Sequence, residues 1–148
     1  MTRDVILVGV DGSPGGSDAL RWALAEASLR ECAVEVITTF QPDAQLSAED
    51  AHAAAEAAQQ TAIDHAAASR QTMPVVSRQV VEGSPAELLI FMSGRAQLMV
   101  LGSHGTESIR HSALGSVGEA CVRLAECPVV VLPRTVPPAA ARDDIVAT

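Results

Sequence analysis

The stretch "LGSHGTESIRHSALGSVGEA", residues 101–120, concentrates glycines and hydroxyl side chains between a hydrophobic run and the start of an expected helix. Gly102, Gly105 and Gly115 follow the spacing G-x2-G-x9-G, and Ser116 comes directly after the last glycine. Because glycine has no Cβ, the backbone can approach a ligand closely or adopt a positive φ. Free N–H groups and the dipole at a helix N-terminus attract anions. The stretch therefore predicts a loop that binds phosphate.

Backbone amides must supply most of the affinity of such a loop. The helix dipole contributes only about 0.3–1 kcal/mol at an exposed site. We therefore expect the N–H groups of 103–106 and 115–117 to bind the phosphates, together with the hydroxyls of Ser103 and Ser116. Arg110 could add a positive charge. The alternative is that the glycines only permit close packing and helix capping, which leaves their regular spacing unexplained.

Asp11 is a second residue that could bind a ligand, because it directly follows the apolar run "DVILVGV" at 4–10. A carboxylate at the end of a buried strand can accept hydrogen bonds from both hydroxyls of a ribose. The alternative is that Asp11 starts a turn or caps the next helix.

Hydrophobic patterning places both features in an alternating series of strands and helices. We expect strands at 4–10, 33–40, 74–81, 96–103 and 128–132, and helices at 17–30, 47–70, 84–94 and 115–126. Apolar strands that alternate with helices indicate an α/β fold, with an open, doubly wound, five-stranded parallel sheet and helices on both faces. In the strand order 3-2-1-4-5, the ends of the first and fourth strands meet at one crevice, where such sheets bind ligands.

Three motifs together resemble the universal stress protein family, in the single-domain form whose members bind ATP. They are the glycine pattern with its following serine, "VGVDGS" at 8–13 and "CPVVVL" at 127–132. The resemblance covers residues 3–132. It implies a nucleotide-binding domain over 1–133. The segment at 134–148 has two prolines and little periodicity, so we expect a flexible C-terminal tail.

The resemblance also implies an adenine-nucleotide site, with ATP as the ligand and with or without Mg²⁺ or Mn²⁺. Asp11 would contact the nucleoside, Gly9 and Val10 would bring backbone towards the adenine, and Thr39 and Phe40 would flank the base. The expected nucleotide-binding residues are Gly9, Val10, Asp11, Thr39, Phe40, Gly102, Ser103, His104, Gly105, Thr106, Gly115, Ser116 and Val117. No catalytic residue is assigned, and the metal ligands stay open.

The loop departs from the family pattern after its second glycine. Where the family usually has a further glycine and an arginine, this chain has Thr106-Glu107-Ser108. At ~6 Å and an effective dielectric constant of about 20, Glu107 would cost roughly 3 kcal/mol against one phosphate charge. Unless this acid points to solvent or helps to hold a divalent metal, AMP or cyclic AMP becomes a competitor of ATP.

These features favour a stress-linked regulatory protein over a dedicated enzyme. The chain has no lysine, no G-x-S-x-G, no G-x-G-x-x-G and no P-loop motif. Slow ATP hydrolysis or autophosphorylation is a minor alternative. The main alternative is a dimeric interaction module that does not bind nucleotide. We expect a homodimer through the strand at Pro128–Leu132, because a short apolar edge strand must be covered.

Composition limits the other partners and the location. The formal net charge of −8 argues against binding to nucleic acid or to an anionic membrane. The N-terminus does not read as a signal peptide and no apolar run is long enough to span a membrane, so we expect a cytoplasmic protein. Cys32, Cys121 and Cys127 lack metal-binding or disulfide spacing and are expected to be small buried hydrophobic residues.

Overall fold

The computed structural model describes residues 4–103 and 115–133 and shows five parallel strands in the order β3-β2-β1-β4-β5, with four helices. The strands are β1 (Val5–Gly9), β2 (Ala33–Phe40), β3 (Val76–Glu82), β4 (Leu98–Gly102) and β5 (Val129–Leu132). The helices are α1 (Pro14–Arg30), α2 (Ala48–Ala68), α3 (Pro85–Ser93) and α4 (Ser116–Leu124). The predicted fold class and strand order are confirmed. The expected tail at 134–148 lies outside the described residues.

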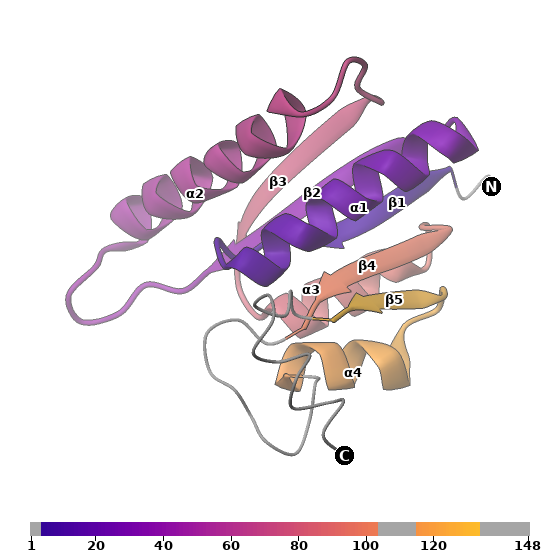
Figure 1. The fold of residues 1–148 in the computed structure, drawn as a ribbon. Helices are drawn as coiled ribbons and strands as arrows, with labels where there is room; N and C mark the ends of the chain where they lie inside the picture. Colours follow the sequence, from indigo (N-terminus) through magenta and orange to yellow (C-terminus); the bar gives the residue numbers. More distant parts are fainter. Residues whose placement is uncertain (1–3, 104–114, 134–148) are drawn as a thin grey trace, which may run out of the picture.

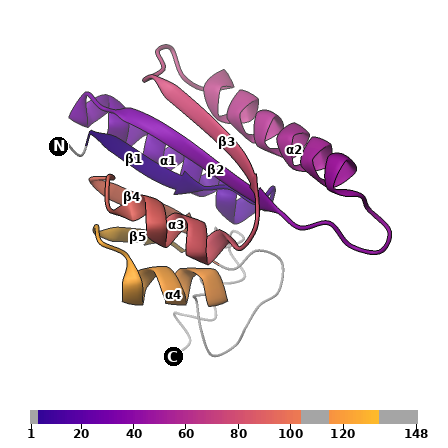
Figure 2. The same ribbon diagram turned by 180° about the vertical axis from the view of Figure 1, so that it is seen from behind.

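Helices cover both faces of the sheet, with α1 and α2 on one side and α3 and α4 on the other (Figures 1 and 2). Alternate strand residues serve the two layers. Ile6 and Val8 of β1 pack in one core with Leu24 of α1, while Leu7 packs in the other core with Leu89 of α3. Because both faces are covered, the two innermost strands, β1 (VILVG) and β4 (LMVLG), are apolar throughout.

Three helices begin with a serine that caps a backbone N–H group. The hydroxyls of Ser13, Ser47 and Ser84 each accept a hydrogen bond from the N–H three residues later. The caps expected at Ser47 and Ser84 are confirmed, and α1 begins at Pro14, not at 17 as expected. The reason is a Ser-Pro pair, a cap followed by proline at the first helical position. The other element boundaries differ from expectation by at most two residues.

Helix α2 lies on β2 and β3 through small side chains and one polar one. Its buried residues are Ala51, Gln59, Ala62 and Ala66, and Gln59 is completely inaccessible. No helix in the described ranges combines the length and the apolar character needed to cross a membrane.

The cysteines lie in or beside the cores. Cys121 and Cys127 are buried as expected, and Cys32 is partly buried. Burial raises the pKa of the Cys121 thiol to about 11, and Cys127 adds to this effect. Burial also raises the pKa of Cys32, which the nearby Arg30 partly offsets. Protonated thiols of this kind pack as small hydrophobic side chains.

Candidate functional site

A pocket of about 220 Å³ lies at the carboxyl ends of β1, β2 and β4, where the strand order reverses direction. Open α/β sheets bind ligands at this position. The first turns of α1 and α4 and one side of α3 complete the wall. The lining residues are Gly9, Val10, Asp11, Ser13, Gly16, Ile37, Thr39, Pro85, Leu89, Leu101, Gly102, Ser103, Gly115, Ser116, Val117 and Gly118.

Most of the expected site residues in the described ranges come together in this pocket. Those that line it are Gly9, Val10, Asp11, Thr39, Gly102, Ser103, Gly115, Ser116 and Val117. Phe40 is not part of the lining, and its ring packs edge-on against His52 with centroids 5.3 Å apart. His104, Gly105 and Thr106 lie outside the described residues, as do Glu107 and Arg110.

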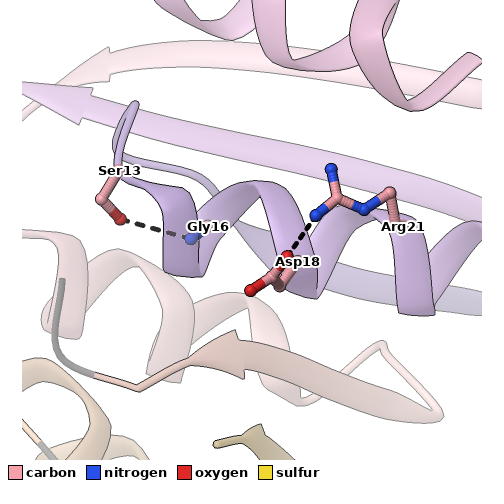
Figure 3. A network of polar contacts seen from close by, with 4 residues as sticks. All are labelled: Ser13, Gly16, Asp18 and Arg21. Carbon is pink, nitrogen blue, oxygen red and sulfur yellow. Dashed lines mark hydrogen bonds and ion pairs between the residues drawn. The ribbon is translucent and has the colours of Figure 1, made fainter. Parts of the chain in front are cut away.

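Three hydrogen bonds link Asp11, Ser13 and Gly16 at the start of α1. The backbone N–H of Ser13 donates to Asp11 Oδ1 at 2.9 Å, and the Ser13 hydroxyl donates to the same oxygen. The Ser13 oxygen in turn accepts from the N–H of Gly16 at 3.2 Å, as Figure 3 shows. Gly12 makes the turn possible with a φ of 87°. Among the described residues both bonds end on Oδ1, so Oδ2 of Asp11 can accept from a ligand.

The polar contacts continue along α1 away from the pocket. Two residues after Gly16, Asp18 pairs with Arg21 on the side of the helix (Figure 3). Arg21 is not part of the pocket lining. This pair therefore belongs to the helix surface, where exposed ion pairs contribute little to stability.

Helix α4 begins at the pocket without a side-chain cap. Its N-cap is Gly115, and the first hydrogen bond within the helix runs from the Glu119 N–H to the Gly115 carbonyl, at 2.9 Å. The N–H groups of Ser116, Val117 and Gly118 therefore have no acceptor within the helix. Gly115 has a φ of −77°, which any residue can adopt. The backbone conformation therefore does not require a glycine at this position.

Ser103, at the end of β4, has a buried hydroxyl that makes no hydrogen bond with the described residues. The residue is 8% exposed, and its backbone N–H donates to the Leu132 carbonyl at 2.9 Å. A buried hydroxyl without a partner costs about 1–3 kcal/mol. A ligand that provides a hydrogen-bond partner would remove this cost. Ser103 lines the pocket in which such a ligand would bind.

Gly102 has a packing role in addition to its place in the pocket lining. A Cβ on Gly102 would lie 2.2 Å from the carbonyl oxygen of Gly15, and a Cβ on Gly15 would lie 2.6 Å from that of Ser103. The first turn of α1 therefore packs backbone to backbone against the end of β4. Glycine at 102 permits this helix–strand contact, and its role in nucleotide binding stays a prediction.

A family model described as the universal stress protein family matches residues 2–133. The chain belongs to this family. Universal stress proteins are generally non-catalytic stress proteins.

Individual relatives agree with this assignment. A universal stress protein of Mycobacterium bovis is 36% identical over 132 residues, which are 85% of this chain and 44% of that protein. A solved universal stress protein in complex with cAMP has a TM-score of 0.72 and 23% identity, covering 91% of this chain and 100% of its own. One from Archaeoglobus fulgidus in complex with dAMP has a TM-score of 0.61 and 22% identity, covering 88% and 98%. The chain spans about half the length of the curated relatives that it matches.

Several lining residues of this universal stress protein domain were not expected. They are Ser13, Gly16, Ile37, Pro85, Leu89, Leu101 and Gly118. The Ser-Pro pair at 13–14 was a signal for one of them, since it marks the start of a helix next to Asp11. The sequence did not indicate the apolar wall of Ile37, Leu89 and Leu101, because these residues come from three separate elements.

The described residues that line the pocket include one ionisable side chain, the carboxylate of Asp11, and no cationic one. In the described part of the chain, no three His, Cys, Asp or Glu side chains gather as a set of metal ligands. The described lining therefore offers an anion N–H groups and hydroxyls.

Proposed function

We propose that this domain binds an adenine nucleotide in the pocket and acts as a stress-linked regulator, not as an enzyme. One observation carries the proposal. The buried Ser103 hydroxyl, which has no partner among the described residues, lines the same pocket as the uncapped N-terminus of α4. A phosphate would satisfy both, because it is an acceptor for hydroxyl and backbone N–H donors alike.

The phosphates lie at the start of α4 in this proposal. The N–H groups of residues 116–118 and the hydroxyls of Ser103 and Ser116 all belong to the lining. Hydrogen bonds to a charged acceptor contribute about 1.5–3 kcal/mol each, more than neutral ones. The helix dipole adds to them in the same direction.

The nucleoside lies at the other end of the pocket. Oδ2 of Asp11 accepts from the ribose hydroxyls, and the apolar wall of Ile37, Leu89 and Leu101 packs against the base. Thr39 at the end of β2 offers backbone polar groups to the edge of the adenine. The role expected for its neighbour Phe40 stays a prediction.

The identity of the nucleotide depends on the loop. The glycine motif predicts ATP, with or without Mg²⁺ or Mn²⁺, whereas two structural relatives carry cAMP and dAMP. The lining contains no cationic side chain among the described residues, which favours a ligand with fewer negative charges. Glu107→Gly removes a negative charge from the loop. We therefore expect this variant to gain more affinity for ATP than for AMP.

Calorimetric titration with ATP, AMP and cAMP, with and without Mg²⁺, tests the proposal directly. The parent should bind at least one of them. Gly115→Val should remove binding, because its side chain occupies the space at the α4 N-terminus while its φ remains allowed. A melting temperature close to that of the parent would show that this variant folds. If the parent gives neither heat nor a thermal shift at millimolar nucleotide, the proposal is wrong.

We also propose that the domain forms a homodimer through β5, with Pro128 preceding the strand. Among the described strands β5 pairs with β4 alone and lies at one edge of the sheet. Met99 N–H donates to the Pro128 carbonyl and Ser103 N–H to the Leu132 carbonyl. Because successive residues of a strand point their peptide groups to opposite sides, those of Val129 and Val131 face the outer edge. A second copy can pair with them across a two-fold axis.

A proline scan of β5 tests this dimer. Val131→Pro removes an outward N–H, so light scattering should show a shift towards the monomer, with the melting temperature of the domain little changed. Val130→Pro is the matched control, because it removes an N–H that faces β4 and should destabilise the domain itself. A parent that is monomeric at micromolar concentration would contradict the dimer.

A further inference from the structure

Gln59 is a completely buried polar side chain in the middle of α2, and it connects the outer strand of the sheet to the pocket. Its Oε1 accepts from Arg78 Nε on β3 at 2.9 Å. Its Nε2 donates to the Gln79 carbonyl at 2.9 Å and to Thr38 Oγ1 at 3.1 Å, with the Val36 carbonyl as a longer third acceptor at 3.3 Å. Gln59 itself is not part of the pocket lining.

The donors and acceptors of these hydrogen bonds can be assigned in only one way. A guanidinium group only donates, so Arg78 fixes Oε1 of Gln59 as the acceptor and Nε2 as the donor. Since the Thr38 hydroxyl then accepts from Gln59, its single proton is left for another partner. That partner is the Val10 carbonyl, whose oxygen lies 2.8 Å from Thr38 Oγ1.

The chain of bonds ends on the peptide between Val10 and Asp11, and both residues line the pocket. The Val10 N–H is also bound, to the Ile37 carbonyl at 2.9 Å. On the far side of the peptide, a Cβ added at Gly16 would meet the Asp11 nitrogen at 3.3 Å, so the first turn of α1 lies close to it. The Val10 carbonyl of this peptide is thus held by the Thr38 hydroxyl.

We infer that Gln59 is a positioning residue: held by Arg78, it orients the Thr38 hydroxyl, which sets the Val10–Asp11 peptide and so the nucleoside end of the pocket. This inference rests on the proposed function. A leucine would bury apolar surface at this place without needing partners, whereas a buried amide is costly unless its hydrogen bonds are made. The Gln59 amide therefore orients the Thr38 hydroxyl, which an apolar side chain at this position would not do.

Variants that keep the size of the side chain but change its hydrogen bonds test the inference. Thr38→Val removes the donor to Val10, and Thr38→Ser restores it. Gln59→Glu replaces the Nε2 donor by an acceptor, so the Thr38 proton can turn away from Val10. The control is Gln60→Leu, which removes a neighbouring contact of α2 to Arg78 but leaves the Gln59 bonds in place.

Titration with adenosine and with tripolyphosphate separates the two ends of the pocket. Thr38→Val and Gln59→Glu should lose roughly two- to tenfold in adenosine affinity, the value of one hydrogen bond, while tripolyphosphate affinity is unchanged. Thr38→Ser and Gln60→Leu should bind adenosine like the parent. An equal loss for both ligands, or an equal loss in Gln60→Leu, would show that the contacts only dock α2, and would overturn the inference.

A measurement without ligand keeps this result distinct from a failure of the proposed function. If the parent binds neither nucleotide nor adenosine, the nucleotide proposal fails, and the carbon-13 shift of the Val10 carbonyl alone tests whether Gln59 sets the Val10–Asp11 peptide. It should move in Thr38→Val and Gln59→Glu and stay in place in Thr38→Ser and Gln60→Leu. An unchanged shift in the first two variants would overturn the inference.

Discussion

Helices α1 and α4 both begin at the carboxyl edge of the sheet and both line the same pocket, yet their N-termini differ. The first turn of α1 is capped by Ser13, whose hydroxyl is in turn bound by Asp11. The first turn of α4 starts at Gly115 and has no side-chain cap. One helix end is thus satisfied by the protein, and the other is left to solvent or to a ligand.

If the proposed function holds, this difference explains how one pocket distinguishes the two parts of a nucleotide. A carboxylate next to α1 already interacts with that helix end and repels a second anion. The bare end of α4, with the buried Ser103 hydroxyl in the same pocket, favours an anion. Under the proposed function, we therefore expect a ligand with hydroxyls at one end and phosphate at the other to bind in one orientation.

The largest effect is expected from the contact that brings the two helix ends together. In Gly102→Ala the new methyl group would lie 2.2 Å from a backbone oxygen of Gly15, so α1 must move away from β4. We expect the free energy of unfolding to fall by about 3 kcal/mol, at the upper end for an overpacked site. Urea denaturation measures it.

Gly9→Ala is the matched control for that change. Its methyl group would meet only side-chain atoms, those of Leu101 and Leu89 at 3.1 and 3.2 Å, which can move aside. It should cost less than Gly102→Ala. Equal losses of unfolding free energy in the two variants would show that the backbone contact between Gly15 and Gly102 is no more sensitive to an added methyl group than side-chain packing is.

A cap on α4 should make its end resemble that of α1. In Gly115→Asp a carboxylate can accept from the N–H groups of the first turn and repel a phosphate there. We expect nucleotide affinity to fall about tenfold to thirtyfold, through loss of a charge-assisted hydrogen bond. Aspartate is also a better cap than glycine by a few tenths of a kcal/mol. Titration and thermal melting should therefore move in opposite directions, and a variant that binds as well as the parent would contradict the phosphate site.

The smallest effect is expected from removing the cap of α1. Ser13→Ala leaves the Gly16 N–H without its acceptor and should cost about 1 kcal/mol of stability. Asp11 also loses a partner, so nucleotide affinity should fall by about twofold. Ser47→Ala removes an equivalent cap from α2, away from the pocket. It should cost similar stability and leave affinity unchanged, and a matching loss of affinity there would remove the link between Ser13 and the site.

The sequence by itself was sufficient for the order of the elements and for much of the pocket lining. Apolar strand runs and serine caps are local signals, which are read within four residues along the chain. The parallel α/β arrangement then brings the ends of β1 and β4 to one edge, so Asp11, Ser103 and Gly115 could be predicted to lie together. The overlooked Ser13-Pro14 start of α1 was also a local signal.

Only the tertiary structure decided why Gly102 is a glycine, which side chains form the apolar wall, and that Gln59 reaches the pocket through Thr38. Each of these depends on a contact between elements far apart in the sequence: Gly15 against Gly102, Leu89 beside Ile37, and α2 against β2 and β3. Residue types and spacing do not encode the distance between two backbones, because that distance depends on how whole helices pack on the sheet. Phe40 shows the same limit: it is next to Thr39 in sequence, yet its ring packs against His52 of α2 and not in the pocket.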